Sequence, residues 1–468
     1  MYKKFVSKTL IALAASGAFS YAVASPDAPA NAVAQNTAAS DDATLKIFEE
    51  WVKDLQKALP TMYKFSLEDY KNEGNLSTGV IRAEIKDFTD DRFYRDPVVL
   101  ASETTATIEH GLTLSKHGIG AGKIQFTTGF SKDTHEEILE VLGSGPFLKA
   151  DGIVTLTGDI HVDLQNPAPF EKDIDNEVLI SIPSYTGEFH TYNTRTTGNL
   201  DITIPSMTVT DANAPEGVKS EGLWVSNLKI NLKDRPIKGG YWEFSGSSSG
   251  SLESAEVRAD GTSLISFNNI TFSETGSIDD KKLYKDEFTM KGEGSFLHKR
   301  TKQTVKIDHF QMDGSIKNMH IDTYLDLMDN LYSGRPDSKK MELQALELLK
   351  HEPEINFSKI ALSFNGHEGT ASLKLSVAPM TEEEKNNMPL YLAFLQKFRV
   401  EAAMDIPEAW VSILFPRDVD ELNAVLSMGE QEGYIVRKDG RIKSDCKYEM
   451  GNLTVNGKPI KGMGGMPF

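Results

Sequence analysis

Residues 246–250 (GSSSG) match the G-x-S-x-G pattern, in which a serine nucleophile stands on a sharp turn between a strand and a helix. In that arrangement Ser248 would attack an acyl carbon with a histidine as its base. A strand pattern does precede the segment, but residues 251–257 (SLESAEV) alternate as a strand or loop does. Because the segment is also low in complexity, we expect a flexible hairpin loop here.

Asp159, His161 and Asp163 alternate along a predicted strand, so they share one face with a spacing of about 7 Å. Carboxylate and imidazole groups are metal ligands, but a metal also needs ligands that converge from elsewhere in the chain. The ten histidines include no H-E-x-x-H motif. We therefore expect an exposed polar face, with no metal site and no cofactor.

Two further patterns favour structural roles. Gly118, Gly120 and Gly122 resemble half of a dinucleotide-binding loop, which requires a strand-to-helix turn. Residues 123–128 (KIQFTT) look like a strand, so a β-turn or bulge is expected instead. The one cysteine, Cys446, lies in a predicted hairpin, where a reactive thiol is possible but a small hydrophobic core residue is expected. None of these patterns assigns a catalytic or cofactor-binding residue.

The elements that must position these side chains are mostly strands. In five segments the apolar residues alternate, skip two positions and alternate again: 202–209, 223–230, 265–272, 305–312 and 355–362. Alternation buries one face of a strand, and a β-bulge at the skipped pair returns the apolar set to that face. A hairpin turn at the skip is the alternative, but pairs such as Asp308-His309 form primed turns poorly. We expect long, bulged antiparallel strands in a curved meander.

Helices and tight turns complete the pattern. Apolar residues at helical spacing predict helices at about 42–59, 131–142, 318–351 (broken at 334–336), 381–398 and 407–432. Asp439-Gly440 and Asn456-Gly457 indicate type I′ turns, and Gly451-Asn452 suits a II′ turn. The fold class is therefore mainly β with α (α+β), with a few helices packed on one face of the sheet.

Composition excludes several classes of function. The 468 residues include 50 Lys+Arg, 68 Asp+Glu and one Cys, for a net charge of -18. This balance argues against a nucleic-acid partner, because phosphate binding depends on clustered Lys and Arg. It also disfavours docking on anionic lipid surfaces. A single cysteine excludes an internal disulfide.

Met1 to Ala24 has the layout of a secretory signal peptide: early lysines, an apolar run, and Ala22-Val23-Ala24 before Ser25. The alternative is an uncleaved anchor, but the run of about 16 residues is shorter than the ~20 that span a bilayer. Cleavage would leave a net charge of -21, since the leader holds three lysines and no acid. Residues 25–42 predict a disordered linker. Residues 43–468 then form a β-rich domain, and any internal division is expected near 313–351.

Four segments stand out together, in this order: residues 70–86, Ile108-Glu109-His110-Gly111, Asp313-Gly314 with residues 349–377, and residues 440–459. Taken together, they resemble the YdgA-like family (DUF945), a bacterial envelope family classed as a domain of unknown function. The His110-Gly111 pair is similar to the family's His-Gly motif, with Leu112 where members often have proline. The likeness extends over most of residues 70–459.

The resemblance implies an envelope location and a largely β domain, and it implies no known reaction. Members commonly keep an N-terminal membrane anchor, whereas Ala22-Val23-Ala24 predicts cleavage here. His110 is the polar family position to test. We expect it to be a turn histidine bonded to backbone, because the sequence shows no partner acid or base.

We therefore expect a non-enzymatic envelope protein that is periplasmic or otherwise exported. Its partner would be an apolar ligand or another envelope protein, bound to an extended apolar sheet face. The alternative is a periplasmic hydrolase that acts through Ser248 or His110, and a third possibility is a purely structural role.

Overall fold

The protein is described from a computed structural model. The structure describes residues 44–46, 48–49, 52–53, 56, 63–85, 100–136, 139–140, 143, 145–174, 178–192, 197–213, 221–236, 244–259, 261–298, 300–331 and 336–460. The expected signal peptide and linker lie outside the described residues. The chain divides into two compact units, Met1–Gly250 and Ser251–Phe468. The segment 313–351, where the sequence suggested a division, lies within the second unit.

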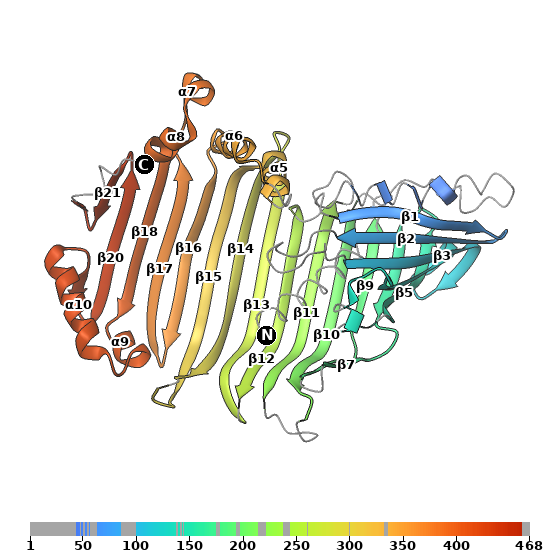
Figure 1. Ribbon diagram of the computed structural model, residues 1–468, viewed down its shortest axis with the longest axis horizontal. Helices are drawn as coiled ribbons and strands as arrows, with labels where there is room; N and C mark the ends of the chain where they lie inside the picture. The colour runs from blue at the N-terminus through green and yellow to red at the C-terminus, as the bar shows by residue number, and fades with distance from the viewer. Residues whose placement is uncertain are drawn as a thin grey trace. The chain divides into compact units, whose positions relative to one another are not determined.

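The first unit is an antiparallel sheet (Figure 1). Its strands are β1 (Tyr63–Asn72), β2 (Leu76–Ile85), β3 (Leu100–Ser115), β4 (Gly118–Phe130), β5 (Pro146–Thr155), β6 (Ile160–Gln165), β7 (Phe170–Ile174), β8 (Val178–Ile182), β9 (Thr186–Tyr192), β10 (Thr197–Asp211) and β11 (Gly222–Pro236). Strands β1 to β6 pair in sequence order, and β6 then pairs with β9, β9 with β10 and β10 with β11. The β7–β8 hairpin pairs with β10 beside β9.

The core of the first unit lies on one face of these strands. Its fully buried large side chains include Phe48, Ile81, Ile108, Ile124, Phe126, Ile160 and Phe189. Phe48 belongs to the helix predicted near 42–59, whose described residues between 44 and 56 are helical. Because core positions alternate along each strand, the other face meets solvent.

The second unit is a long antiparallel meander. Its strands are β13 (Thr262–Ile278), β14 (Leu283–Leu297), β15 (Thr304–His320), β16 (Glu354–Phe364), β17 (His367–Val377), β18 (Phe398–Pro407), β19 (Val436–Lys438), β20 (Arg441–Glu449), β21 (Asn452–Val455) and β22 (Lys458–Pro459). Strands β13 to β18 pair in sequence order, and β18 then pairs with β20. Together the strands and the few helices of the two units confirm the predicted class, mainly β with α.

The predicted bulges are confirmed in the second unit. Register shifts fall at the skipped positions between Asn268 and Thr271, between Ile307 and His309, and between Phe357 and Ile360. Asn269 adopts φ 51°, a left-handed conformation that asparagine tolerates better than most residues. In the first unit the skips of β10 and β11 lie opposite each other, so the register there continues without a shift.

Helices in the second unit lie near the strand ends (Figure 1). They are α5 (Ile321–Leu331), α6 (Ser338–Leu349), α7 (Glu382–Asn387), α8 (Leu390–Lys397), α9 (Ala409–Leu414) and α10 (Val419–Glu432). Pro389 lies between α7 and α8, and Pro416 lies between α9 and α10. Each interrupts the helical pattern, because proline is unfavourable inside a helix. Among the described residues, none of the helices has the length and apolar character needed to cross a bilayer.

Two predicted local structures need correction. Residues 246–250 belong to strand β12 (Gly246–Ala259) and not to a flexible hairpin loop. The tight turn after β20 is made by Met450 (φ 52°) and Gly451 (φ 75°), so it is not a II′ turn at Gly451-Asn452. The type I′ turns at Asp439-Gly440 and Asn456-Gly457 are confirmed by positive φ at both residues of each pair.

Candidate functional site

One face of the β13–β18 sheet carries apolar side chains in consecutive rows. Residues paired across antiparallel strands point to the same face. The central row is Phe272, Met290, Met312, Ile360, Ala371 and Met404. The next rows along the strands hold Phe288, Phe357, Leu373 and Ala402, then Ile316, Ile355, Leu375 and Val400. We call this surface the apolar face.

The opposite face of the same strands is polar. One of its rows runs Thr275, Glu287, Ser315, Asn356, Lys374, Glu401 and Lys447. Ion pairs cross the strands on this face, with Glu354 bound to Lys374 at 2.9 Å and Arg399 bound to Glu449 at 2.9 Å. A sheet with one polar and one apolar face must bury the apolar face against something else.

In the part of the chain that the structure describes, helices pack on the apolar face near its two ends. Trp410, Ile413 and Leu414 of α9 pack on a cluster around Val305 and Phe364. Leu346 and Leu349 of α6, with Ala393 of α8, pack at the other end around Val377 and Met380. Helix packing on one face is thus confirmed at both ends.

The middle of the apolar face stays accessible. No side chain of the central row is buried, and Phe272 and Ile355 are 36% and 38% exposed. From strand and row spacing, the central row extends about 24 Å across the strands, and the three rows extend about 14 Å along them. The second row has Glu274 beside Phe288, and the third has Asp286 beside Ile316, so the apolar residues of these rows begin one and two strands later. An exposed contiguous apolar surface of this size marks an interaction site in a water-soluble fold.

Aromatic rings pack against one another and over a glycine on the apolar face. Phe288 packs edge-on against Phe357, with ring centroids 5.8 Å apart, and Phe310 packs the same way against Phe267 at 6.1 Å. The Phe288 ring lies over Gly314, where a Cβ atom would come within 2.8 Å of the ring's Cε2 atom. A glycine at this point lets the ring of the neighbouring strand lie across the sheet, so the surface has apolar content without a projecting side chain.

A polar hollow of about 440 Å³ opens along the same strands. Its lining includes Thr275, Glu287, Thr289, Asp313 and Ser315. Asp313 already accepts hydrogen bonds from the Thr289 hydroxyl and, at 2.7 Å, from the Gln311 amide. Because both hydrogen bonds engage the Asp313 carboxylate, the polar hollow is a weaker candidate for ligand binding than the apolar face.

The residues proposed for hydrolysis lie in ordinary strand positions. Ser248 is buried, at 6% exposed, in β12, without the strand-to-helix turn that a nucleophile elbow needs. His110 lies on β3 rather than in a turn, and its Nε2 is 2.8 Å from the Ser77 hydroxyl. Ser77 is fully buried, so a substrate carbonyl cannot reach it. Within the described residues the other ring nitrogen, Nδ1, has no hydrogen-bond partner.

The structure also shows where the glycine pattern and the cysteine singled out in the sequence lie. The register of β4 shifts between Gly120 and Gly122, as expected for a bulge. Cys446 lies on the apolar face beside Ala402 and Val455, and it is half-buried rather than part of a core.

Three histidines from separate segments gather on the first unit. The rings of His117 and His161 are 5.7 Å apart, and those of His161 and His190 are stacked at 5.3 Å. Asp163 contacts His117 Nε2 at 3.2 Å and Lys116 Nζ at 2.6 Å. In the described part of the chain no three His, Cys, Asp or Glu side chains are arranged to hold a metal. Cross-strand register creates this cluster, so spacing within one strand could not reveal it.

The histidine cluster predicts a loss of stability in acid. Burial and the nearby His190 and His117 lower the pKa of His161, against smaller opposite effects of Asp159 and Glu188. The unfolded chain therefore binds a proton more readily than the folded chain, and the free energy of unfolding falls as the pH drops below about 6.5. Urea unfolding at pH 7.5 and 5.5 should show a smaller fall in His161→Gln. His309→Gln, a change at a half-exposed site in the second unit, should keep the wild-type fall, and an equal fall in all three proteins would contradict the prediction.

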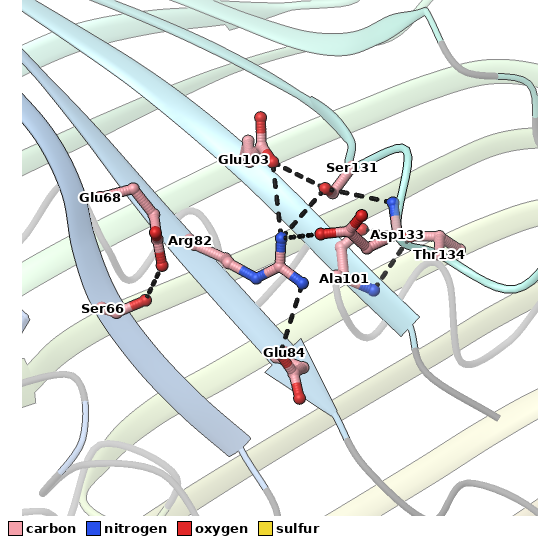
Figure 2. A network of polar contacts seen from close by, with 9 residues as sticks. All are labelled: Ser66, Glu68, Arg82, Glu84, Ala101, Glu103, Ser131, Asp133 and Thr134. Carbon is pink, nitrogen blue, oxygen red and sulfur yellow. Dashed lines mark hydrogen bonds and ion pairs between the residues drawn. The ribbon is translucent and has the colours of Figure 1, made fainter. Parts of the chain in front are cut away.

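A second polar cluster joins β2, β3 and the segment after β4 (Figure 2). Arg82 Nη1 donates to Asp133 at 2.7 Å and to Ser131 at 3.2 Å, and Arg82 Nη2 lies 3.4 Å from Glu84. Burial opposes the charge, but these carboxylates outweigh it and raise the pKa of Arg82. The Ser131 hydroxyl donates in turn to Glu103 at 2.6 Å. With both Nη groups directed at protein acceptors, this cluster stabilises the first unit rather than binding a ligand.

Taken together, the fold defines a β-rich protein with one extended apolar sheet face. The chain belongs to the family described as "Bacterial protein of unknown function (DUF945)", whose model matches residues 77–462. No curated protein and no solved structure matches the chain.

Proposed function

We propose that the protein is an exported, non-enzymatic binding protein of the bacterial envelope that holds an apolar chain on the apolar face. The observation that carries the proposal is the contrast between the two faces of β13–β18. One face is covered with charged and hydroxyl groups, and the other has a half-exposed central row that includes Phe272, Met290 and Met312.

The dimensions favour a long hydrocarbon chain as the ligand. The central row is about 24 Å long, from strand spacing, and one leaflet of a bilayer core is about 15 Å thick. A lipid chain can therefore lie fully extended along the face. Export is supported by the signal-peptide layout of Met1 to Ala24, which would deliver the protein to the periplasm, where lipids cross between membranes.

The test is binding of dodecanol, measured by displacement of the uncharged dye Nile red from the full chain. We expect saturable displacement in the wild type. Met290→Glu should raise the dodecanol Kd at least about tenfold, because the carboxylate loses water when a hydrocarbon chain covers it.

Thr271→Glu is the matched control, since Thr271 lies on the polar face opposite Lys291. It adds the same charge on the neighbouring strand and should leave the Kd unchanged. Displacement that never saturates, or equal affinities in wild type and Met290→Glu, would exclude the apolar face as the binding site.

A further inference from the structure

We propose that a pocket at the α9 end of the apolar face binds the anionic headgroup of the ligand, a phosphate monoester that carries a long alkyl chain. This inference rests on the proposed function, because the alkyl chain is placed on the apolar face. The pocket measures about 340 Å³, within the range of small-molecule sites, and it lies wholly in the second unit. Its lining is His298, Arg300, Leu414, Phe415, Pro416, Arg417 and Asp418.

Two arginines stand in this pocket against one carboxylate. Arg300 Nη1 is 3.2 Å from Asp418 Oδ2, and Arg417 Nη2 donates to the Arg300 carbonyl at 3.1 Å. A guanidinium has five N–H donors, so these two contacts leave most donors of the pair available to an anion. Guanidinium groups bind phosphate oxygens through paired hydrogen bonds, which favours phosphate over a smaller anion.

The two sides of the pocket are also joined by His298, which lies in its lining. His298 Nε2 lies 3.2 Å from the Leu414 carbonyl, and His298 Nδ1 accepts from the Thr301 backbone N–H at 3.2 Å. These bonds link the β14–β15 turn to the end of α9. The hydrogen bond from Arg417 to the Arg300 carbonyl adds a second link, so two arginines that are 117 residues apart in sequence lie at one place.

One side chain, Leu414, connects the pocket to the end of the apolar face that α9 covers. Leu414 lines the pocket and also packs on the cluster that contains Phe267 and Phe296. Both rings are half-buried, and Phe267 lies on β13, as does Phe272 of the central row. Phe415, half-exposed at the rim, adds apolar surface at the mouth. A ligand with a charged head and an alkyl chain matches this sequence of surfaces.

The acidic net charge of the chain sharpens the choice of ligand. A net charge of -18 repels anions at long range, so it disfavours binding of the whole protein to an anionic membrane surface. A single monoester in direct contact with two arginines is bound at short range, where local donors dominate. The apolar chain supplies further affinity that free phosphate lacks.

The experiment compares dodecyl phosphate, dodecanol and inorganic phosphate as displacers of Nile red from the full chain, with the first kept below its critical micelle concentration. In the wild type we expect dodecyl phosphate to bind at least about tenfold more tightly than dodecanol, and inorganic phosphate to displace no dye. Arg417→Gln and Arg300→Gln should each remove most of that preference while leaving dodecanol affinity unchanged. Lys302→Gln, which removes a cation from the same turn outside the pocket lining, should keep the preference.

The outcomes separate the two proposals. If dodecanol fails to bind, the apolar face itself is wrong. If dodecanol binds but dodecyl phosphate is no tighter, or if both arginine variants keep the preference, the headgroup site is wrong and the apolar face stands. Calorimetric titration with inorganic phosphate tests whether the pocket binds free phosphate instead of the phosphate of a lipid headgroup. If it binds as tightly as dodecyl phosphate, the pocket is a free-phosphate site and the inference is overturned.

Discussion

Replacing Gly314 with alanine should lower the free energy of unfolding of the second unit by about 2 kcal/mol, the usual range for overpacking. The added Cβ atom would lie 2.8 Å from Phe288 Cε2, so the ring must move. Phe288 is packed edge-on against Phe357, so that movement also breaks an aromatic pair. Scanning calorimetry should show a fall in Tm of about 4–8 °C, since a unit of this size shifts by about 2–4 °C per kcal/mol.

Gly429→Ala in α10 is the matched control. There the new Cβ atom meets Ile435 at 3.6 Å, an ordinary contact, and alanine favours the helix. Its Tm should stay or rise. A double variant with Phe288→Leu should recover part of the loss at Gly314, because the shorter side chain vacates the space. Equal Tm values for Gly314→Ala and Gly429→Ala would show that the ring does not constrain the sheet.

Replacing Arg82 with methionine should destabilise the first unit by about 2–3 kcal/mol, because removing the cation of a part-buried ion-pair network leaves neighbouring carboxylates that repel one another. The change leaves the Glu84 carboxylate, whose side chain is only 17% exposed, and its neighbours Glu103 and Asp133 without their shared cation. Calorimetry of the full chain, with hydrogen exchange of β2 and β3 peptides to locate the transition, measures the effect.

Lys71→Met is the control for lost charge alone. Lys71 pairs with Asp69 at 3.1 Å, but both side chains are more than half exposed, so the pair contributes less than about 1 kcal/mol. A loss at Lys71 as large as that at Arg82 would mean that net charge, not the network, sets the stability.

Sequence patterns predicted the parts of this fold that depend on neighbouring residues. The skip between Phe267 and Ile270 predicted a bulge, because period-two alternation must be restored across the skipped pair, and the register shift confirms it. Asp439-Gly440 gave a I′ turn, because both residues tolerate positive φ. The strand at residues 246–250 was mistaken for a loop, since Gly and Ser carry little strand preference and pairing with neighbouring strands overrides it.

The candidate sites were less predictable, because each joins distant residues. Alternation did indicate an apolar sheet face, but only the register shows that Phe272 and Met404 stand in one row. Arg300 and Arg417 lie in separate turns, and nothing in their local sequence links them. Arg82 is a single cation between two apolar strand residues, and its partner Asp133 follows 51 residues later.

The pairing of β13 to β18 in strict sequence order makes this part of the molecule a one-dimensional array. Each strand depends on its immediate neighbours, so stability accumulates as a series of nearest-neighbour terms. Adding or removing a hairpin changes the reach of the apolar face by about 10 Å, two strand spacings, and leaves the remaining rows in register. If the apolar face holds a hydrocarbon chain as proposed, the number of hairpins sets the length of chain that it can hold.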